Sequence, residues 1–157
     1  MSGFAEFYLA TRDAAFRAVL AAGASRATAE DAVAEAYARA CARWTMLEGH
    51  PDPFAWVMRT AFNWQRSWWR RTRLESLGAA IPDKIHLVPE TADTRLRELV
   101  RRLPSRQRAV VALRVIADLS AERTAEILGI SPATVHVHLH RALTALRKQT
   151  EPLEVTG

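Results

Sequence analysis

The chain has 157 residues, 49% of them hydrophobic, which is enough for one domain or two small ones with true cores. Its net charge of +5 favours a polyanionic partner, and its single cysteine excludes an intramolecular disulfide, so we expect a cytoplasmic protein. It contains no apolar run of about 18 residues and no signal-peptide core, so we expect no membrane association.

The N-terminal region predicts two helices. Apolar residues recur at helical spacing from Phe4 to Ala22, and Gly23 ends this first helix. A second helix is predicted from Ala29 to Trp44, with Thr28 as its N-cap. A charged stripe at four-residue spacing lies opposite its apolar side and consists of Asp31, Glu35 and Arg39. Such a stripe is ordinarily a solvent-exposed face stabilised by a Glu–Arg pair.

A long basic helix follows a predicted loop from Thr45 to Pro53. The segment from Phe54 to Arg73 contains no acid, five arginines and four tryptophans. Arginine interleaved with aromatic rings suits a nucleic acid, because guanidinium groups bind phosphates and rings stack on unpaired bases. We assign Trp56 to the core and leave Trp64 and Trp68 open. The predicted DNA-contacting residues of this helix are Asn63, Arg66, Arg70 and Arg71.

The helical period is lost after this helix, where Gly and Pro punctuate the chain. The prediction is therefore an all-α protein of two small helical domains joined by a flexible linker. Two helices begin the second domain, at residues 94–103 and from Ser105 to about Ala117. The predicted divisions are an N-terminal domain at 1–73, the linker at 74–92, a C-terminal domain at 93–150 and a tail at 151–157.

The end of the second domain predicts two helices joined by a tight turn. The first spans Ala121 to Leu128, with Ser120 as N-cap and Gly129 as the left-handed residue that ends it. Ser131 caps the second helix, which begins with Pro132. This is the helix-turn-helix arrangement, in which the second helix enters the DNA major groove. Its predicted core-facing residues are Val135, Leu139, Leu143 and Leu146.

Two helices joined by a glycine turn also occur in ordinary bundles. The run Leu-Gly-Ile-Ser-Pro-Ala-Thr-Val, from Leu128 to Val135, is far more specific than that and favours DNA binding. The candidate DNA-contacting residues of this motif are Arg123, Ser131, Thr134, His136, Val137, His138 and Arg141.

Three histidines at alternate positions, His136, His138 and His140, also raise the question of a metal site. His136 and His140 are one helical turn apart, but no third ligand of a suitable kind lies nearby in the sequence, so we expect neither a metal nor another cofactor. An alternative hypothesis is that the histidines strengthen DNA binding at lower pH, because protonation near the ordinary pKa of about 6.5 adds positive charge.

Four segments resemble, in family order, the extracytoplasmic-function (ECF) sigma factors of bacterial RNA polymerase. The first is Ala-Glu-Asp-Ala-Val-Ala-Glu at 29–35, and the second begins Asp-Pro-Phe-Ala-Trp-Val at 52 and reaches Asn63. The third is Leu-Pro-Ser-Arg-Gln-Arg at 103–108, and the fourth is the helix-turn-helix. Any one of these segments is weak evidence, but the series covers most of residues 5–148.

This resemblance implies a role beyond DNA binding. The N-terminal domain would bind core RNA polymerase through the helix with Asp31, Glu35 and Arg39. It would also open the −10 promoter element and hold single-stranded bases, using the loop before Pro53 and the helix around Asn63. The C-terminal domain would read the double-stranded −35 element, and an anti-sigma factor is a further candidate partner. Where the family usually has Lys-Ser-Arg, this chain has His136-Val137-His138, so its −35 sequence is expected to differ.

Two other classes of protein are alternatives to this family. A stand-alone helix-turn-helix regulator that binds an operator is the alternative function, but the N-terminal half shows no ligand pocket or phosphoacceptor pattern. An enzyme is not expected, because the sequence has no paired carboxylates beside a basic groove, no Gly-rich phosphate loop and no nucleophile–His arrangement.

Overall fold

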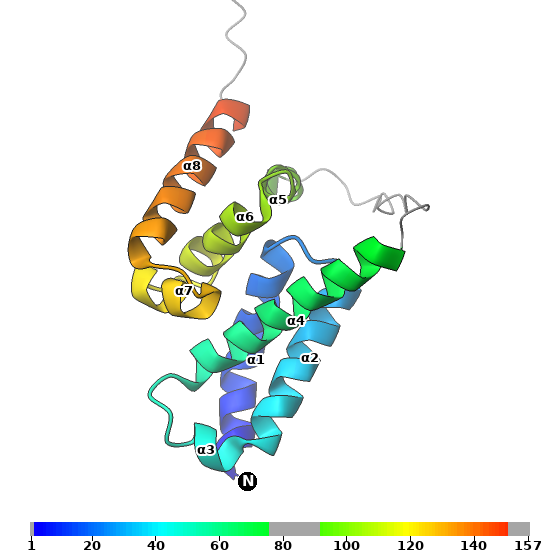
Figure 1. Cartoon of the computed structure of the whole chain (residues 1–157), viewed down its shortest axis with the longest axis vertical. Helices are drawn as coiled ribbons and strands as arrows, with labels where there is room; N and C mark the ends of the chain where they lie inside the picture. The colour runs from blue at the N-terminus through cyan, green and yellow to red at the C-terminus, as the bar shows by residue number, and fades with distance from the viewer. Residues whose placement is uncertain (1, 76–91, 151–157) are drawn as a thin grey trace, which may run out of the picture.

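The computed structural model describes residues 2–75 and 92–150, with side chains from 3 to 67 and from 95 to 150. Within these ranges the chain is helical and has no strand, which confirms the predicted all-α class (Figure 1). The elements are α1 (Ser2–Ala21), α2 (Arg26–Ala42), α3 (Trp44–Leu47), α4 (Pro53–Glu75), α5 (Ala92–Arg101), α6 (Ser105–Val111), the π-helical turn η1 (Ala112–Ile116), α7 (Ala121–Leu128) and α8 (Pro132–Thr150).

The predicted linker and tail fall mostly outside the described residues. Helix α4 continues to Glu75, two residues beyond its predicted end, and α5 begins at Ala92, two residues earlier than predicted. Residues 76–91 and 151–157 are not described, so the division of the chain into two domains at a linker stays a prediction.

The N-terminal half is a bundle of α1, α2 and α4 with small residues at the contacts. Alanine side chains let helix backbones approach closely, and one face of α2 is buried as its periodicity predicts. Helix α4 adds Val57, Met58 and Ala61, none of which has exposed surface. The fully buried alanines of the other two helices are Ala15, Ala18, Ala29, Ala32, Ala36 and Ala40.

Aromatic rings hold the first half of α1 against α2 and α3. The ring centroids of Tyr8 and Tyr37 are 5.1 Å apart in an edge-on arrangement, and those of Phe7 and Trp44 are 5.2 Å apart. Such pairs stabilise a fold by more than their buried area alone. Tyr37 is almost fully enclosed, and burial raises the pKa of its hydroxyl to about 12.

Two predictions for this half were wrong. Helix α2 begins three residues earlier than predicted, because Ser25 is its N-cap and accepts a hydrogen bond from the Thr28 N–H at 3.2 Å. The predicted loop after α2 instead begins with the short helix α3, because burial of Leu47, with no exposed surface, folds this segment back onto the core. Ser25 was as good a local N-cap as Thr28, whereas no local signal indicated α3.

In the C-terminal half, α8 packs on α5 and α6. Val135, Leu139 and Leu146 of α8 face the core as predicted, but Leu143 is 36% exposed and Ala142 is fully buried in its place. The prediction for Leu143 was therefore wrong. The small side chain of Ala142 lets Val100, Leu103 and Val111 approach α8, which turns the neighbouring Leu143 toward solvent.

The helix predicted to reach about Ala117 is α-helical only to Val111 and ends in η1. The Ala117 N–H bonds to the Ala112 carbonyl at 2.9 Å, five residues back, which is the π-helical pattern. Ile116, an apolar residue of this segment, is 48% exposed, because the wider turn ends beside solvent.

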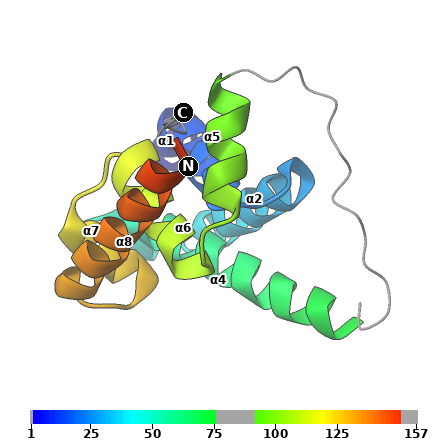
Figure 2. The same ribbon diagram turned by 90° about the horizontal axis from the view of Figure 1, so that it is seen from above.

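The two halves pack directly against each other. Helix α7 lies beside the start of α4, and η1 lies against α1 (Figures 1 and 2). One cluster of buried side chains runs through both halves and includes Val57 and Met58 of α4 together with Ala121 and Ile127 of α7. The start of α4 is thus placed next to the helix-turn-helix, although about 70 residues separate them in sequence.

Gly129 provides a test of the turn that positions α8. Its φ of +69° is in the left-handed region, and a Cβ there would meet no atom within 4 Å, so replacement costs only backbone strain. We expect Gly129→Ala to lower the free energy of unfolding by about 1 kcal/mol in urea denaturation followed by circular dichroism. Gly49→Ala is the control, because Gly49 has no positive φ and its Cβ would only just reach the Met46 carbonyl. Equal effects of the two changes would contradict this account.

Candidate nucleic-acid interface

The caps predicted for the helix-turn-helix are confirmed. The Ser120 hydroxyl accepts a hydrogen bond from the Arg123 N–H at 3.1 Å, and Ser131 accepts one from the Thr134 N–H at 3.1 Å. Gly129 ends α7 in the left-handed conformation. The caps satisfy N–H groups that the first turn of each helix leaves unpaired, so the sequence itself determines the turn between the helices.

The N-terminal part of α8 has one face in the core and one toward solvent. Val135 is fully buried against α7, where Ala125 and Leu128 are also buried. Ser131, His136 and Arg141 are exposed, Thr134 is half-buried, and Val137 is 45% exposed. This solvent face therefore offers hydroxyl, imidazole, aliphatic and guanidinium groups at a helix N-terminus, which attracts anions.

The histidines of α8 differ from one another. His136 and His140 are exposed, whereas His138 is half-buried. The Nδ1 atom of His138 is enclosed and has no hydrogen-bond partner in the described part of the chain. Nowhere in the described ranges do three metal-ligating side chains come together closely enough to hold an ion.

Helix α4 presents part of its predicted DNA-contacting face. Asn63 and Arg66 are exposed, while the side chains of Arg70 and Arg71 lie outside the described set. Trp56 and Trp64 are half-buried and pack against the core. Trp56 therefore belongs to the core as predicted, and Trp64, which was left open, also packs against the core. The side chain of Trp68, the other tryptophan left open, is not described.

The charged stripe of α2 lies on its solvent face, away from the buried alanines. Asp31 and Arg39 are exposed and Glu35 is half-exposed. Arg39 Nε lies 2.9 Å from Glu35 Oε1, which confirms the predicted pairing. An exposed pair of this kind contributes only a few tenths of a kcal/mol to stability. The fold therefore does not require these charges, and they are free to serve an interface.

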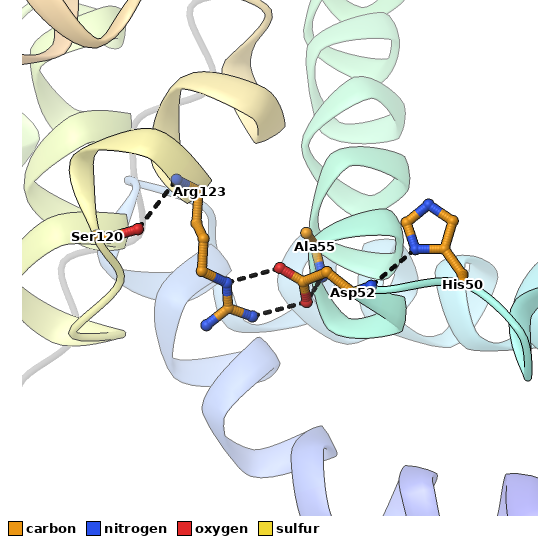
Figure 3. A network of polar contacts seen from close by, with 5 residues as sticks. All are labelled: His50, Asp52, Ala55, Ser120 and Arg123. Carbon is orange, nitrogen blue, oxygen red and sulfur yellow. Dashed lines mark hydrogen bonds and ion pairs between the residues drawn. The ribbon is translucent and has the colours of Figure 1, made fainter.

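Arg123 contacts the N-terminal half (Figure 3). Its Nε is 2.6 Å from Asp52 Oδ2 and its Nη2 is 2.7 Å from Asp52 Oδ1, so the ion pair is bidentate. The same Asp52 carboxylate caps α4 by accepting a hydrogen bond from the Ala55 N–H at 3.1 Å. The Asp52 N–H donates to His50 Nδ1, and the Arg123 guanidinium lies 5.9 Å from the centre of the Phe54 ring.

Sequence reasoning did not identify this network. The DNA-contacting role assigned to Arg123 stays a prediction, but in the structure its guanidinium is paired with Asp52. An Asp before a Pro that begins a helix is a recognisable N-cap. No local signal indicates its partner, because Arg123 is 71 residues further along the chain.

The ion pair changes the protonation equilibria of both partners. The hydrogen bond from Arg123 lowers the pKa of the Asp52 carboxyl, and the bond to Asp52 raises the pKa of Arg123. The side chain of Asp52 is 22% exposed and that of Arg123 is 39% exposed, so water screens the pair only in part.

The described helices include none that is both long and apolar enough to cross a membrane.

Comparison with known proteins gives consistent matches. Residues 93–146 match the family model described as Sigma-70, region 4. An RNA polymerase sigma-E factor from Streptomyces coelicolor is 32% identical over 150 residues, which is 93% of this chain and 85% of that protein. The ECF RNA polymerase sigma factor ShbA from Streptomyces griseus is 46% identical over 55 residues, or 35% of this chain.

Two solved structures share the fold. The sigma factor RpoE from Bartonella quintana, in complex with the anti-sigma factor NepR, matches with a TM-score of 0.83 and 21% identity. That match covers 97% of this chain and all of the other, so it includes both halves. CnrH, in complex with the cytosolic domain of CnrY, matches with a TM-score of 0.68 and 22% identity over 93% of this chain and 86% of that one.

The Asp52–Arg123 pair predicts a pH-dependent contribution to stability. A carboxyl whose folded-state pKa is lowered stabilises the fold above its unfolded value, here 3.8, and loses that contribution as the pH falls through the folded value. We expect Asp52→Asn, which can still cap α4, to lower the free energy of unfolding by about 1 kcal/mol at pH 7.

The deficit of Asp52→Asn should shrink as the solution is acidified below the unfolded pKa, when measured by urea denaturation at a series of pH values. Glu30→Gln is the matched control, because it removes a carboxylate from the exposed Arg26–Glu30 pair and should change little. A deficit that does not vary with pH would contradict a charged pair.

Proposed function

The chain belongs to the RNA polymerase sigma factors, and on that premise we propose that it directs core polymerase to promoters through a −35 reading helix, a −10 contacting helix and a polymerase-binding helix. The observation that carries the proposal is the capped helix-turn-helix, whose exposed α8 face lies in the region that matches the family model. Membership of this family favours a sigma factor over a stand-alone operator-binding regulator.

Helix α8 is proposed to enter the major groove of the −35 element. The exposed positions of Ser131 and His136, with the half-buried Thr134 between them, support contacts to phosphates and base edges near the helix N-terminus. Val137 is aliphatic at a position where the family usually has a polar residue, and an aliphatic group can contact the methyl of thymine. His138 and Arg141 complete the proposed face, and Arg123 joins it once released from Asp52.

Helix α4 is proposed to hold the opened −10 strand. Exposed Asn63 and Arg66 support contacts with bases and phosphates, and the basic run continues into Arg70 and Arg71. Capturing an unstacked base must offset an unstacking and unpairing cost of a few kcal/mol. Arginine and amide side chains on a rigid helix suit that purpose, because little further order is lost on binding.

Helix α2 is proposed to bind core polymerase through Asp31, Glu35 and Arg39. Their exposure, together with the small contribution of such a pair to the fold, supports this assignment. The protein would then act in the cytoplasm with the polymerase, which itself catalyses transcription, and we assign no catalytic step to this chain. An anti-sigma factor is a further proposed partner, since the similar Bartonella protein was solved with one.

The polymerase contact can be tested by run-off transcription. With core polymerase and genomic promoter fragments, the protein should yield specific transcripts. Asp31→Ala/Glu35→Ala should reduce them at least about ten-fold at limiting core, because a lost interface costs more than about 1.4 kcal/mol. Glu30→Ala is the control, since Glu30 is an exposed acid on the same helix but outside the stripe.

Two outcomes separate the proposed function from its alternative. Transcripts lost with the stripe variant but retained with Glu30→Ala would support the sigma-factor role and identify the promoter. No transcripts and no core binding, combined with operator binding by the protein alone, would favour the stand-alone regulator.

The histidines of α8 predict that DNA affinity depends on pH. On the hypothesis that a lower pH adds positive charge to this face, affinity for the −35 duplex should rise several-fold from pH 8 to pH 6. Fluorescence anisotropy at constant ionic strength would measure this, and His136→Gln should reduce the rise. Equal affinity at both pH values would argue against the idea while leaving the sigma-factor assignment intact.

A further inference from the structure

Helix α8 packs on α6 and α7 at the edge of the molecule and keeps one face toward solvent (Figure 1). Ala133, Val137 and His140 follow one another at spacings of four and three residues and are all exposed. At these spacings they lie on one side of the helix and form the centre of its solvent face. Thr134 and His138 are half-buried and lie at the border of that face.

The centre of this face lacks the side chains that ordinarily read guanine and adenine. Arg and Lys bind guanine, and Asn and Gln bind adenine, through paired hydrogen bonds in the major groove. None of these four residue types occurs in α8 before Arg141. Ala133 and Val137 present only methyl groups, and the complement of a methyl group in the major groove is the C5 methyl of thymine.

We propose that Ala133 and Val137 form an apolar reading edge that selects thymine in the −35 element through its C5 methyl group. The inference rests on the proposed function and deepens it, because it names the base that α8 recognises. It concerns the choice of sequence, whereas the run-off experiment concerns the contact with core polymerase.

The spacing of the two side chains sets the spacing of the thymines. Ala133 and Val137 are about 6 Å apart along the helix axis, at 1.5 Å per residue. Each base pair rises about 3.4 Å, so a helix aligned with the groove places the two methyl contacts about two base steps apart. The proposal therefore commits to two thymines about two steps apart in the −35 element.

Exposed aliphatic side chains also mark protein-binding surfaces, but two features of this surface favour DNA. Arg141, one turn after Val137, is exposed and supplies a cation for a phosphate beside the proposed base contact. The face also belongs to a capped helix-turn-helix within the residues that match the region 4 model. A protein partner would bind Val137 without regard to thymine methyl groups, and this difference can be measured.

Deoxyuridine provides the probe, because it pairs as thymine does and lacks only the C5 methyl. The full chain, assembled with core polymerase, is bound to a promoter fragment from the run-off experiment while each −35 thymine is replaced in turn. Replacing the thymine that faces Val137 should weaken binding about four-fold, the change expected when one methyl group is no longer withdrawn from water. In Val137→Ser the same replacement should have no effect, because the partner methyl groups are gone.

Two further variants make the comparison specific. Val137→Thr keeps one of the two methyl groups and should retain part of the discrimination between thymine and deoxyuridine. Val115→Ser is the matched control, because Val115 is a valine of η1 with 54% of its surface exposed, outside α8, and it should leave the four-fold difference unchanged. Val137 belongs to neither buried cluster of the described residues, so urea denaturation should show equal stability for all variants.

The outcomes separate this inference from the proposed function. A −35 element without thymine, or deoxyuridine effects that are equal in the parent and in Val137→Ser, would overturn the inference and leave the sigma-factor role intact. If no transcripts form, the chain alone is tested on a selected operator. A methyl effect that depends on Val137 there would support thymine reading and reject the sigma-factor role. No specific binding in either assay would overturn both.

Discussion

The contact between α7 and the start of α4 is the interaction on which the arrangement of this protein depends. Apolar side chains such as Ile127 and Val57 contribute most of its favourable free energy, because hydrophobic burial scales with area and has no preferred direction. The Asp52–Arg123 pair adds direction, since a bidentate ion pair tolerates little rotation. Together they place the helix-turn-helix against the loop that precedes α4.

Asp52 is where local and long-range structure meet. Its carboxylate accepts a backbone N–H at the beginning of α4 and two guanidinium N–H groups from α7. The first interaction is a helix cap that belongs to the local sequence, and the second joins the halves. A residue with both roles couples the start of α4 to the position of Arg123, so a change in the ion pair affects the structure of both halves.

The charged stripe of α2 and the exposed side chains of α8 beyond its cap are proposed interface groups that the fold does not need. The Glu35–Arg39 pair of α2 is exposed, and the solvent face of α8 lies opposite the buried Val135. Side chains that contribute little to stability can be selected for recognition without unfolding the protein. Trp64 shows the opposite case, because a ring that suits base stacking is half-buried against the core and has a structural contact.

The sequence by itself determined the helix-turn-helix, including both ends of α7 and the start of α8, because caps, left-handed glycines and N-terminal prolines act within a few residues of each other. It also determined the buried face of α2, the exposed face with Asp31 and the all-α class. Only tertiary packing decided the helix α3, the exposure of Leu143 and the partner of Arg123. Each of these depends on which surface a distant segment brings close, and neither helical periodicity nor a local motif contains that information.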